Sequence, residues 1–449
     1  MEIQNKKKVS VLGLGKTGVS VANLLSELGY DVFVSEILPL EKVKHNIRLL
    51  KPDIKYEVGI HSDKVLDANL IVKSPGIPQN IPVLVEARKR NIEILSELEM
   101  SSSFISPKLV IAITGTNGKT TVTTLIGEIF KNAGFDTIVA GNIGTPLSDF
   151  VKKITKESIV VLEVSSYQLE NIKKFKPDIS CILNITSDHL EHHSSMDEYV
   201  KAKKNIFLNQ TKSDYCVLNF DDRITRELGN CCSSKVVYFS YRRKLKEGTF
   251  FDGRNFNVNL NDKKIKFEVR LKIPGRHNVE NALASATIAF LYNLPVNIVK
   301  STLNSFNGVE HRLEFVKEID GVKYINDSKS TNVDSTLVAL ESFQKNKNII
   351  LIMGGRDKGF PYTPLRPLVK QRVKYLLLIG ESAKKIESDL NGATEIINCG
   401  DISNAVKYAK KVAKNGDIVL LSPGCSSFDQ FENFEHRGKE FKRLIKENA

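Results

Sequence analysis

A glycine-bracketed loop that follows a short apolar stretch constrains the fold of this chain more than any other feature. The segment 112–121 reads AITGTNGKTT, so an apolar strand runs into two glycines and a Lys-Thr-Thr triplet before a helix expected from Val122. The glycines let successive backbone N–H groups point inward, and the helix N-terminus adds its positive dipole at the same point. This pattern predicts a phosphate-binding loop made by Gly115, Thr116, Asn117, Gly118, Lys119, Thr120 and Thr121.

Within this loop, Lys119 is placed to contact a β- or γ-phosphate, and the Thr120 hydroxyl is placed to ligate Mg²⁺ on the nucleotide. The spacing departs from the common G-x-x-x-x-G-K-[ST] pattern, because Ile113 stands where the first glycine belongs. An ordinary glycine turn before a helix is the simpler alternative. The complete context of strand, loop, Lys-Thr pair and helix favours phosphate binding.

The length of 449 residues predicts two to four domains, because it exceeds a single core. The pattern of strands and glycine turns divides the chain into three domains of an α/β protein. Residues 1–102 contain a strand at Val9–Leu12 and a literal G-x-G-x-x-G over 13–18, as in a Rossmann-like parallel sheet. Residues 103–307 form a central P-loop ATPase-type α/β domain around the phosphate-binding loop. Residues 308–449 repeat the strand and helix alternation, which predicts a second Rossmann-like parallel sheet.

The formal net charge of +13 raises the question of nucleic-acid binding. The lysines are dispersed without interleaved aromatic residues, so solvated surface and an anionic small substrate explain the charge better. The sequence has no run of 18 apolar residues and no signal-peptide pattern, and its six cysteines lack C-x-x-C spacing. We therefore expect a cytoplasmic protein that binds neither nucleic acid nor membrane, without a zinc site or a disulfide framework.

Polar side chains follow the predicted strands of the central domain. Glu163 ends one strand, and Asp188 and His189 follow the next. Because the carboxyl ends of parallel strands line the ligand crevice of an open sheet, these side chains are expected near Lys119. Taken singly, each would more often be a helix cap or a surface group.

The helix expected over Met196–Leu208 has a lysine on its apolar face. Tyr199, Ala202 and Ile206 point inward at helical spacing, and Lys203 lies one turn beyond Tyr199 on that face. Either Lys203 reaches solvent along the face, as long cationic side chains do, or it points toward the metal site.

Three loops of the C-terminal domain are rich in small, hydroxylic or cationic residues. They follow predicted strands and cover residues 327–332, 354–358 and 422–428. Lys, Ser and Thr donors at helix N-termini hold anions well, so we expect an amino-acid carboxylate or a nucleotide phosphate there. The asparagine-rich helix start at 276–281 suits a nucleotide, although a helix N-cap is the simpler explanation.

Six motifs resemble those of the ATP-dependent Mur ligases of peptidoglycan synthesis: TGTNGKTT, EVSSYQLE, NITSDHLEHH, PGRHNVENALA, HRLE and NDSKSTN. The stretches GLGKTG, KSPGIP and LSPGCSSFDQFENFEHRG look most like the family member that adds D-glutamate to UDP-N-acetylmuramoyl-L-alanine. The resemblance implies an N-terminal domain that binds the UDP of the sugar nucleotide, a central ATPase, and a C-terminal domain that binds the amino acid.

The resemblance also implies roles for individual residues. Two Mg²⁺ ions would be held by Thr120, Glu163, His189 and Lys203, with Lys203 carbamylated so that it becomes carboxylate-like. Besides the phosphate-binding loop, ATP would be held by Asn278, Asn281, Arg312 and Asp327. The sugar nucleotide would be bound by Gly15, Lys16, Thr17, Gly76, Asn142 and Gln168, and D-glutamate by Thr331, Lys358, Ser427 and Phe434.

One stretch departs from the family pattern. Glu36 stands about where a carboxylate meets a ribose hydroxyl in dinucleotide folds. The chain reads Ser-Glu-Ile-Leu there, whereas some relatives have a Thr-Arg pair near the uracil and phosphate. The uridine contacts around Glu36 and Ile37 are therefore left open.

The implied reaction begins when the carboxylate of the L-alanyl group attacks the γ-phosphate of ATP, which gives an acyl phosphate and ADP. Lys119 and two Mg²⁺ ions would offset the repulsion between these anions. The amine of D-glutamate would then attack the acyl phosphate, and phosphate would leave. His189 is a candidate for the proton acceptor.

Several alternatives remain at this point. A sibling Mur ligase or a folylpolyglutamate synthetase would share the architecture. The first glycine turn alone would suit an NAD-dependent dehydrogenase, which leaves the central loop unexplained. The phosphate-binding loop alone would suit a P-loop kinase or a nucleotide switch, which leaves both Rossmann-like domains unexplained. We expect a monomer with hinges near Met100–Pro107 and Phe306–Glu310.

Overall fold

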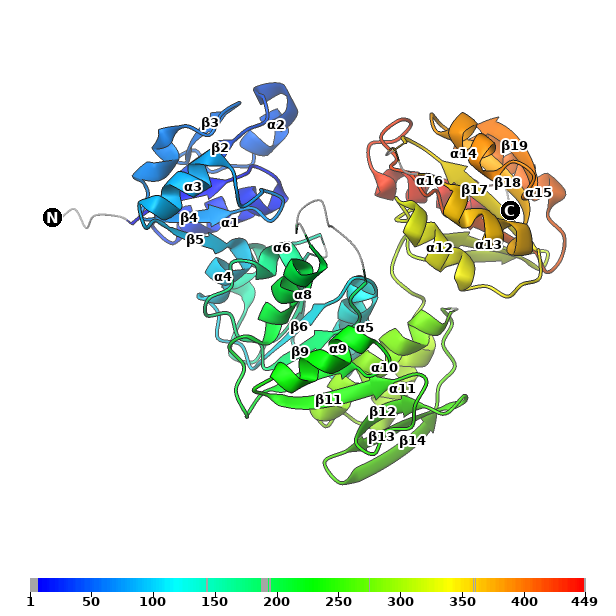
Figure 1. Ribbon diagram of the computed structural model, residues 1–449, viewed down its shortest axis with the longest axis horizontal. Helices are drawn as coiled ribbons and strands as arrows, with labels where there is room; N and C mark the ends of the chain where they lie inside the picture. The colour runs from blue at the N-terminus through cyan, green and yellow to red at the C-terminus, as the bar shows by residue number, and fades with distance from the viewer. Residues whose placement is uncertain are drawn as a thin grey trace. The chain divides into compact units, whose positions relative to one another are not determined.

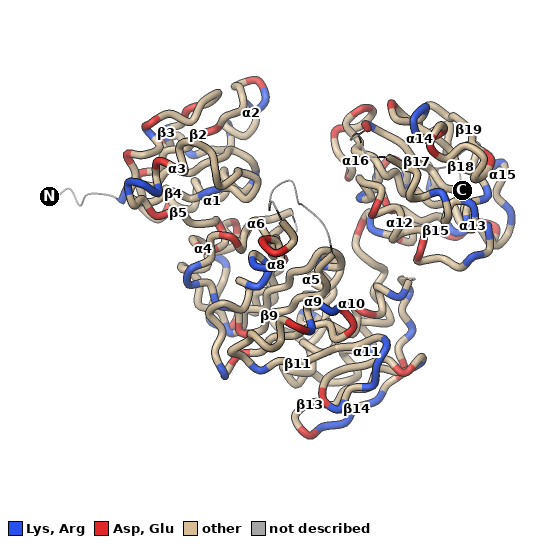
Figure 2. Tube along the Cα trace, in the orientation of Figure 1, with Lys and Arg blue, Asp and Glu red and all other residues tan. Residues whose placement is uncertain are grey.

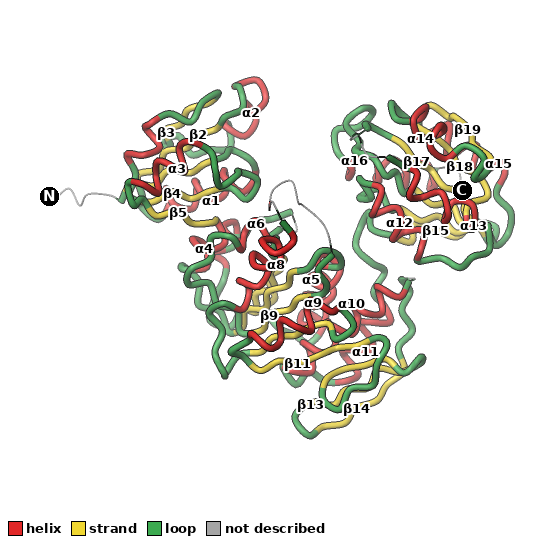
Figure 3. The backbone as a smooth tube through the Cα atoms, viewed as in Figure 1, coloured by secondary structure: helices red, strands yellow, loops and turns green. Residues whose placement is uncertain are grey.

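The computed structural model describes residues 7–142, 144–186, 193, 195–273, 275–357, 359 and 361–447. The chain divides into two compact units, one made by Met1–Val269 with Glu280–Leu303 and one made by Arg270–Val279 with Asn304–Ala449. Among the described residues, the first unit holds two β-sheets and the second holds one, each accompanied by helices (Figures 1 and 3). This arrangement confirms the predicted α/β class with three sheets.

Charged residues of both signs are interspersed along the chain in both units (Figure 2). None of the helices in the described ranges is both long enough and apolar enough to cross a membrane.

The N-terminal sheet is wholly parallel, with the strand order β3-β2-β1-β4-β5. The short apolar runs that predict strands are buried in β1, β2 and β4. The sequence pattern does not predict β3, because KYEV is a half-exposed edge strand without an apolar run. The elements are β1 (Lys8–Leu12), α1 (Lys16–Glu27), β2 (Asp31–Glu36), α2 (Leu40–Ile47), β3 (Lys55–Val58), β4 (Leu70–Lys73), α3 (Pro82–Lys89), β5 (Glu93–Ser96) and α4 (Glu97–Ser102).

The central sheet has the order β14-β13-β12-β11-β10-β9-β6-β8-β7 and is mixed. Its strands are β6 (Leu109–Thr114), β7 (Thr137–Gly141), β8 (Ile159–Glu163), β9 (Ile179–Ile182), β10 (Tyr215–Asn219), β11 (Lys235–Ser240), β12 (Gly248–Phe251), β13 (Asn255–Leu260) and β14 (Lys263–Glu268). From β7 to β12 in this spatial order, which includes β6, neighbouring strands are parallel. The pairs β12 with β13 and β13 with β14 are antiparallel. Strands β13 and β14 form a hairpin, in whose turn Asn261 and Asp262 adopt left-handed φ angles of 49° and 61°.

The helices of this part are α5 (Lys119–Asn132), α6 (Ser166–Leu169), α8 (Met196–Lys204), α9 (Arg223–Leu228), α10 (Arg276–Leu291) and α11 (Val296–Ser305), with 3₁₀ turns η2 (Leu147–Asp149) and η3 (Val151–Lys153). Helix α5 begins at Lys119 rather than at the predicted Val122. Gly118 has a φ of 87° and turns the chain from the loop directly into the helix. The helix predicted from Met196 ends at Lys204 and continues as a 3₁₀ turn over Asn205–Phe207.

The C-terminal sheet has the order β15-β16-β20-β17-β18-β19. Strands β16 to β19 in this order are parallel, but β15 is antiparallel to β16, so the sheet is mixed rather than wholly parallel as predicted. Asp320 and Gly321, with φ angles of 50° and 74°, close this hairpin. The elements are β15 (Glu314–Ile319), β16 (Val322–Asn326), α12 (Val333–Glu341), β17 (Ile349–Gly354), α13 (Arg366–Arg372), β18 (Val373–Ile379), α14 (Ala383–Leu390), β19 (Glu395–Gly400), α15 (Ile402–Val412), β20 (Ile418–Leu421) and α16 (Phe434–Lys446).

Candidate active site

The predicted phosphate-binding loop joins β6 to α5 and is held by a residue that sequence reasoning missed. Asn184, which follows β9, accepts the Thr116 N–H at its carbonyl (2.9 Å) and the Asn117 N–H at its side chain (2.8 Å). Its amide also donates to the Asn117 carbonyl at 3.1 Å. Strand β9 lies next to β6, so the two strand ends share one edge of the sheet. The sequence signals were the position of Asn184 at the end of a predicted strand and its place as the first residue of the motif NITSDHLEHH.

Gly118 brings a predicted ATP residue against the loop. A Cβ atom at Gly118 would lie 2.3 Å from Oδ1 of Asn281, so the carboxamide fits directly against the glycine. Asn278 and Asn281 lie three residues apart in α10, and each is 5% exposed. Because both side chains are buried on one side of the helix, they are not ordinary surface asparagines.

Two lysine ammonium groups meet at one backbone carbonyl of the loop. Lys119 Nζ donates to the carbonyls of Gly115 and Thr116, both at 2.8 Å, and Lys203 Nζ donates to Gly115 at 2.8 Å. Lys203 is 1% exposed and lies 4.5 Å from the ring centroid of Tyr199. The Tyr199 hydroxyl reaches Oγ1 of Thr116 at 3.2 Å. The prediction that Lys203 faces inward is confirmed, and the solvent-reaching alternative is wrong.

The carboxylate of Glu163 lies at the end of β8, in register with Ile113 of β6. It is 3% exposed, and its Oε1 accepts a hydrogen bond from Asn142 Nδ2 at 3.1 Å. Oε2 has no hydrogen-bond partner among the described residues. A buried carboxylate oxygen without a donor is costly unless a cation meets it.

The oxygen atoms that side chains offer near the loop therefore suit a hard divalent cation such as Mg²⁺ as ligands. The Thr120 hydroxyl belongs to a residue that is 3% exposed, and both it and Glu163 offer oxygen ligands. Mg²⁺ prefers such oxygen ligands together with substrate phosphates. Predicted site residues His189 and Asp188 lie outside the described residues.

The predicted sugar-nucleotide residues come from two sheets of the first unit. Gly15 is the N-cap of α1, Lys16 and Thr17 form its first turn, and Lys16 Nζ donates to the carbonyl of Gly144 beyond β7. Asn142 lies in the same turn after β7 as Gly144. The structure therefore brings the first glycine turn to the second one, which the sequence order alone did not indicate.

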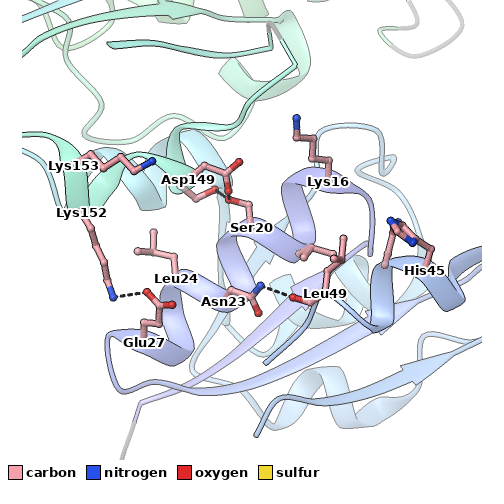
Figure 4. A pocket seen from close by; sticks show the side chains of 13 residues that line it. Lys16, Ser20, Asn23, Leu24, Glu27, His45, Leu49, Asp149, Lys152 and Lys153 are labelled. Atoms are coloured by element: carbon pink, nitrogen blue, oxygen red, sulfur yellow. Dashed lines mark hydrogen bonds and ion pairs between the residues drawn. The ribbon is translucent and has the colours of Figure 1, made fainter. Parts of the chain in front are cut away.

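Further contacts join α1 to the turn after β7, around a cavity of about 720 Å³ (Figure 4). Ser20 Oγ lies 2.6 Å from Ser148 Oγ and donates to Asp149, while Lys152 pairs with Glu27. These contacts hold α1 beside η2 and η3, so the N-terminal sheet is attached to the central sheet along this helix.

Gln168 is engaged within its own helix. Its Oε1 accepts the Ser165 N–H at 3.0 Å, while Ser165 Oγ accepts the Gln168 N–H, which makes a capping box for α6. Gly76 lies elsewhere, on a cavity of about 1,120 Å³ that Tyr167, Glu170 and His193 also line. The predicted sugar-nucleotide residues thus surround the junction of the two sheets rather than one compact point.

Glu36 braces the first glycine turn. Its two carboxylate oxygens accept the N–H of Leu14 at 2.6 Å and the N–H of Leu38 at 2.9 Å, and the residue is 7% exposed. The carboxylate that we expected near a ribose hydroxyl therefore fixes the backbone of two segments, the first glycine turn and the loop after β2.

In the second unit, Asp327 and Arg437 join the loops at the carboxyl ends of three neighbouring strands. Asp327 accepts the Leu313 N–H (3.2 Å) and the Ser422 hydroxyl (2.8 Å), and burial raises the pKa of its carboxyl to about 7 against the attraction of Arg312 and Arg437. Arg437, which is fully buried, donates to the carbonyls of Ser328 and Cys425, and burial lowers its pKa to about 10.

The predicted amino-acid residues are distributed over these same loops. Thr331 follows β16, Ser427 follows β20 and is 2% exposed, and Phe434 begins α16 with Lys329 Nζ 5.2 Å from its ring centroid. Lys358 lies outside the described residues. The loop that carries it is joined to the Ser427 loop, because the Arg356 N–H donates to the Ser426 carbonyl at 2.9 Å.

One cluster of carboxylates and a histidine lies beside the predicted ATP residue Arg312. Glu310, His311 and Glu314 have ligand atoms close enough to share a cation. Lys442 Nζ already lies 2.6 Å from Glu310 and 2.8 Å from Glu314, so its ammonium neutralises the two carboxylates. We therefore interpret this cluster as an ion-pair network rather than a metal site.

Comparison with known proteins places this geometry in a family. The chain matches the family models described as Mur ligase MurD-like, N-terminal domain (residues 7–96), Mur ligase middle domain (113–289) and Mur ligase, glutamate ligase domain (311–425). The solved structure of UDP-N-acetylmuramate-alanine ligase from Thermotoga maritima is similar in fold, with a TM-score of 0.62 at 20% identity over 98% of this chain and 100% of that one.

Curated relatives are similar over nearly their whole length. The UDP-N-acetylmuramoylalanine--D-glutamate ligase of Clostridioides difficile (strain 630) is 44% identical over 97% of this chain and 97% of its own. The protein of the same name from Koribacter versatilis (strain Ellin345) is 42% identical over 99% of this chain and 98% of its own. The chain therefore belongs to the Mur ligase family, and within it to the UDP-N-acetylmuramoylalanine--D-glutamate ligases.

Proposed function

We propose that this chain joins D-glutamate to UDP-N-acetylmuramoyl-L-alanine at the expense of ATP, through an acyl phosphate, in the synthesis of peptidoglycan precursors. The observation that carries the proposal is 44% identity to a D-glutamate ligase over 97% of both chains. The phosphate-binding loop with Lys119, Glu163 and Lys203 around it supplies the chemistry that such a ligation needs.

The loop residues neutralise charge where a carboxylate must approach a triphosphate. Lys119 follows the left-handed Gly118 and can turn its ammonium from the loop carbonyls toward the β- and γ-phosphates. Mg²⁺ bound through Thr120 and Glu163 would supply further positive charge to the transferring phosphoryl oxygens. Asn281 beside Gly118 is placed to fix the nucleotide against the loop.

Carbamylation of Lys203 would resolve the meeting of two ammonium groups at the Gly115 carbonyl. In that reaction the ammonium first loses one proton, and the neutral amine then attacks CO₂ and releases a second proton, so a cation becomes an anion. A carbamate at this position would carry oxygen ligands toward the same cation that Glu163 serves. His189 is our candidate for a second metal contact and for the acceptor of the D-glutamate proton.

The other two substrates are assigned to different parts of the chain, the sugar nucleotide to the first unit and D-glutamate to the second. We assign the sugar nucleotide to Gly15, Lys16, Thr17, Gly76, Asn142 and Gln168, and D-glutamate to Thr331, Lys358, Ser427 and Phe434. We propose the domain limits 1–102, 103–307 and 308–449, and the family matches at 7–96, 113–289 and 311–425 lie within them. We further propose a monomer that works in the cytoplasm.

The deciding experiment measures phosphate release from ATP in the presence of UDP-N-acetylmuramoyl-L-alanine. D-Glutamate is compared with L-lysine, meso-diaminopimelate and L-alanine at equal concentrations. We expect release with D-glutamate alone, together with the mass of the ligated product. Release that does not depend on D-glutamate, or that prefers one of the other amino acids, would reject the assignment in favour of a sibling ligase.

A further inference from the structure

Lys73, at the end of β4, is a buried cation that the proposed mechanism does not use. Its side chain is 1% exposed, among the largest fully buried side chains of the described residues. Its ammonium donates to the carbonyl of Ile77 at 2.5 Å and, at the longer distance of 3.5 Å, to that of Pro75. The ammonium of Lys73 therefore bridges two carbonyls of the turn Ser74-Pro75-Gly76-Ile77.

This turn packs against the first glycine turn. The Ser74 N–H donates to the Leu12 carbonyl at 2.9 Å, and a Cβ atom at Gly13 would lie 2.8 Å from Ser74 Oγ. Gly76, in the same turn, lines the cavity of about 1,120 Å³. A shift of the Ser74–Ile77 turn would therefore move both surfaces that we assign to the sugar nucleotide.

The contact of Lys73 with the Pro75 carbonyl also determines which way the N–H of Gly76 points. In a trans peptide the C=O and N–H bonds point in opposite directions. The described peptide bonds contain no cis form. Because the Pro75 carbonyl points toward the ammonium of Lys73, the N–H of Gly76 in the same peptide unit points away from it. That N–H is a donor of the kind that anions need.

The charges around Lys73 tie the turn to the central sheet. The carboxylate of Glu170, which follows α6, attracts the ammonium, and the guanidinium of Arg88 in α3 repels it. Glu170 also accepts a hydrogen bond from Gln79 Nε2 at 2.9 Å and lies 3.3 Å from His193 Nδ1. Burial outweighs the attraction of Glu170 and lowers the pKa of Lys73 to about 8.

We propose that Lys73 is a positioning residue for the sugar nucleotide, holding the Ser74–Ile77 turn so that the Gly76 N–H faces the anionic substrate. This inference rests on the proposed function. Folding stability does not explain why a lysine is buried here, because burying an ammonium costs free energy that an apolar side chain would not cost. A positioning role does explain it.

The test compares Lys73→Met, which keeps the shape of the stem and removes the charge, with Lys89→Met as the matched control. Lys89 is an exposed lysine of α3. We expect Lys73→Met to raise KM for UDP-N-acetylmuramoyl-L-alanine about tenfold, as for the loss of a charge-assisted hydrogen bond. The KM values for ATP and D-glutamate should stay unchanged, and Tm should stay equal or rise.

The pH profile is a second readout, which a purely structural role would not move. Below pH 8 the ammonium is present; above it the neutral amine is a weaker donor, so the wild-type KM for the sugar nucleotide should rise between pH 7.5 and 9.5. The folded state also releases this proton at a lower pH than the unfolded chain, whose pKa is 10.5. The wild-type Tm should therefore gain a contribution from about pH 8 upward that Lys73→Met lacks.

An unchanged KM for the sugar nucleotide in Lys73→Met would overturn the inference, as would a fall in Tm with all three KM values altered together. If that variant does not fold, a wild-type KM that stays flat through pH 8 overturns it instead. A wild-type protein without D-glutamate-dependent phosphate release would reject the proposed function, a result that the unchanged KM of one variant cannot mimic.

Discussion

Lys203 is a buried lysine that shares one backbone acceptor with a second lysine. It is buried, it shares the Gly115 carbonyl with Lys119, and it lies over the ring of Tyr199. A second cation at this point repels the first one. If Lys203 acts as a carbamate, removal of its side chain should cost a metal ligand and not a cation.

We therefore predict that Lys203→Ala lowers kcat on the order of 10³-fold, as for loss of several kcal/mol of charge stabilisation. Acetate or propionate should restore part of the activity, and methylammonium should not. The exposed Lys212, in the loop before β10, provides the control Lys212→Ala with little effect. Full activity of Lys203→Ala, or rescue by methylammonium instead of acetate, would contradict the carbamate role.

Asp327 predicts a pH-dependent stability. Its folded-state pKa of about 7 exceeds its ordinary 3.8, so the folded protein binds more protons than the unfolded chain between about pH 4 and 7. The free energy of unfolding therefore falls as pH rises through that window and stays lower above pH 7. Asp327→Asn should remove this loss, because asparagine can still accept the Leu313 N–H.

The measurement is Tm at pH 5 and pH 8. Asp327→Asn should gain roughly 1–3 kcal/mol more stability, relative to wild type, at pH 8 than at pH 5. KM for ATP should rise if Asp327 holds the nucleotide as proposed. The control is Asp334→Asn, an exposed carboxylate of α12. Equal changes in Tm at both pH values would show that Asp327 is charged in the folded protein throughout.

Helix α5 shows how the same residue type serves two purposes at the two ends of one element. Gly118 before the helix and Gly134 after it have φ angles of 87° and 86°. A Cβ atom at Gly118 would meet Asn281 Oδ1 at 2.3 Å, whereas nothing lies within 4 Å of a Cβ atom at Gly134. The two positions therefore share a left-handed backbone that would strain any other residue, and they differ in the contact that a side chain would meet.

Gly134→Ala should cost about 1 kcal/mol of stability, the strain of an L-residue in the left-handed region, without changing kinetics. Gly118→Ala should cost more and raise KM for ATP by at least about tenfold, because Asn281 must move away from the loop. Urea unfolding and steady-state kinetics on both variants measure the difference. Equal effects of the two substitutions would mean that the Asn281 contact is unimportant.

The elements also show what one sequence can predict. Apolar runs predicted the buried strands β1, β6 and β17, and helical spacing predicted that Lys203 faces inward. Edge strands such as β3 and β19 lack apolar runs and were missed. Antiparallel β15 was missed as well, since strand direction depends on the Asp320-Gly321 turn rather than on the strand itself.

Site residues divide in the same way. Those that follow a strand or begin a helix, such as Glu163 and Lys119, could be predicted because parallel strands end at one edge. Asn184, Arg437 and Lys73 could not, because each acts on the backbone of a segment distant in sequence or folded back on it. Each lies in a stretch that resembles the family, but the residue and its sequence neighbours do not show which backbone it contacts.

At the scale of the whole molecule, stability is divided between two units. Each described hydrophobic core lies wholly within one of them: Val11 and Leu162 belong to cores of the first unit, and Leu351 and Leu420 to cores of the second. Separate cores predict that the chain unfolds in at least two calorimetric transitions.

Glu97 and Asp327 allow these transitions to be assigned. Glu97 of α4 is fully buried and accepts the Ser148 N–H at 2.8 Å, so it joins the N-terminal and central sheets within the first unit. Glu97→Ala should lower one transition by the equivalent of about 2–4 kcal/mol, because it leaves a cavity and an unpaired N–H. Glu97→Gln, which keeps the acceptor and removes a carboxyl whose pKa burial raises, should not lower it.

The second transition should respond only to Asp327→Asn, and at pH 8 more than at pH 5. Scanning calorimetry of wild type and the three variants at both pH values distinguishes the cases. Two transitions that move independently would mean that the units unfold separately. One transition that shifts with substitutions in either unit would mean that the chain unfolds cooperatively and that the division of cores does not govern its stability.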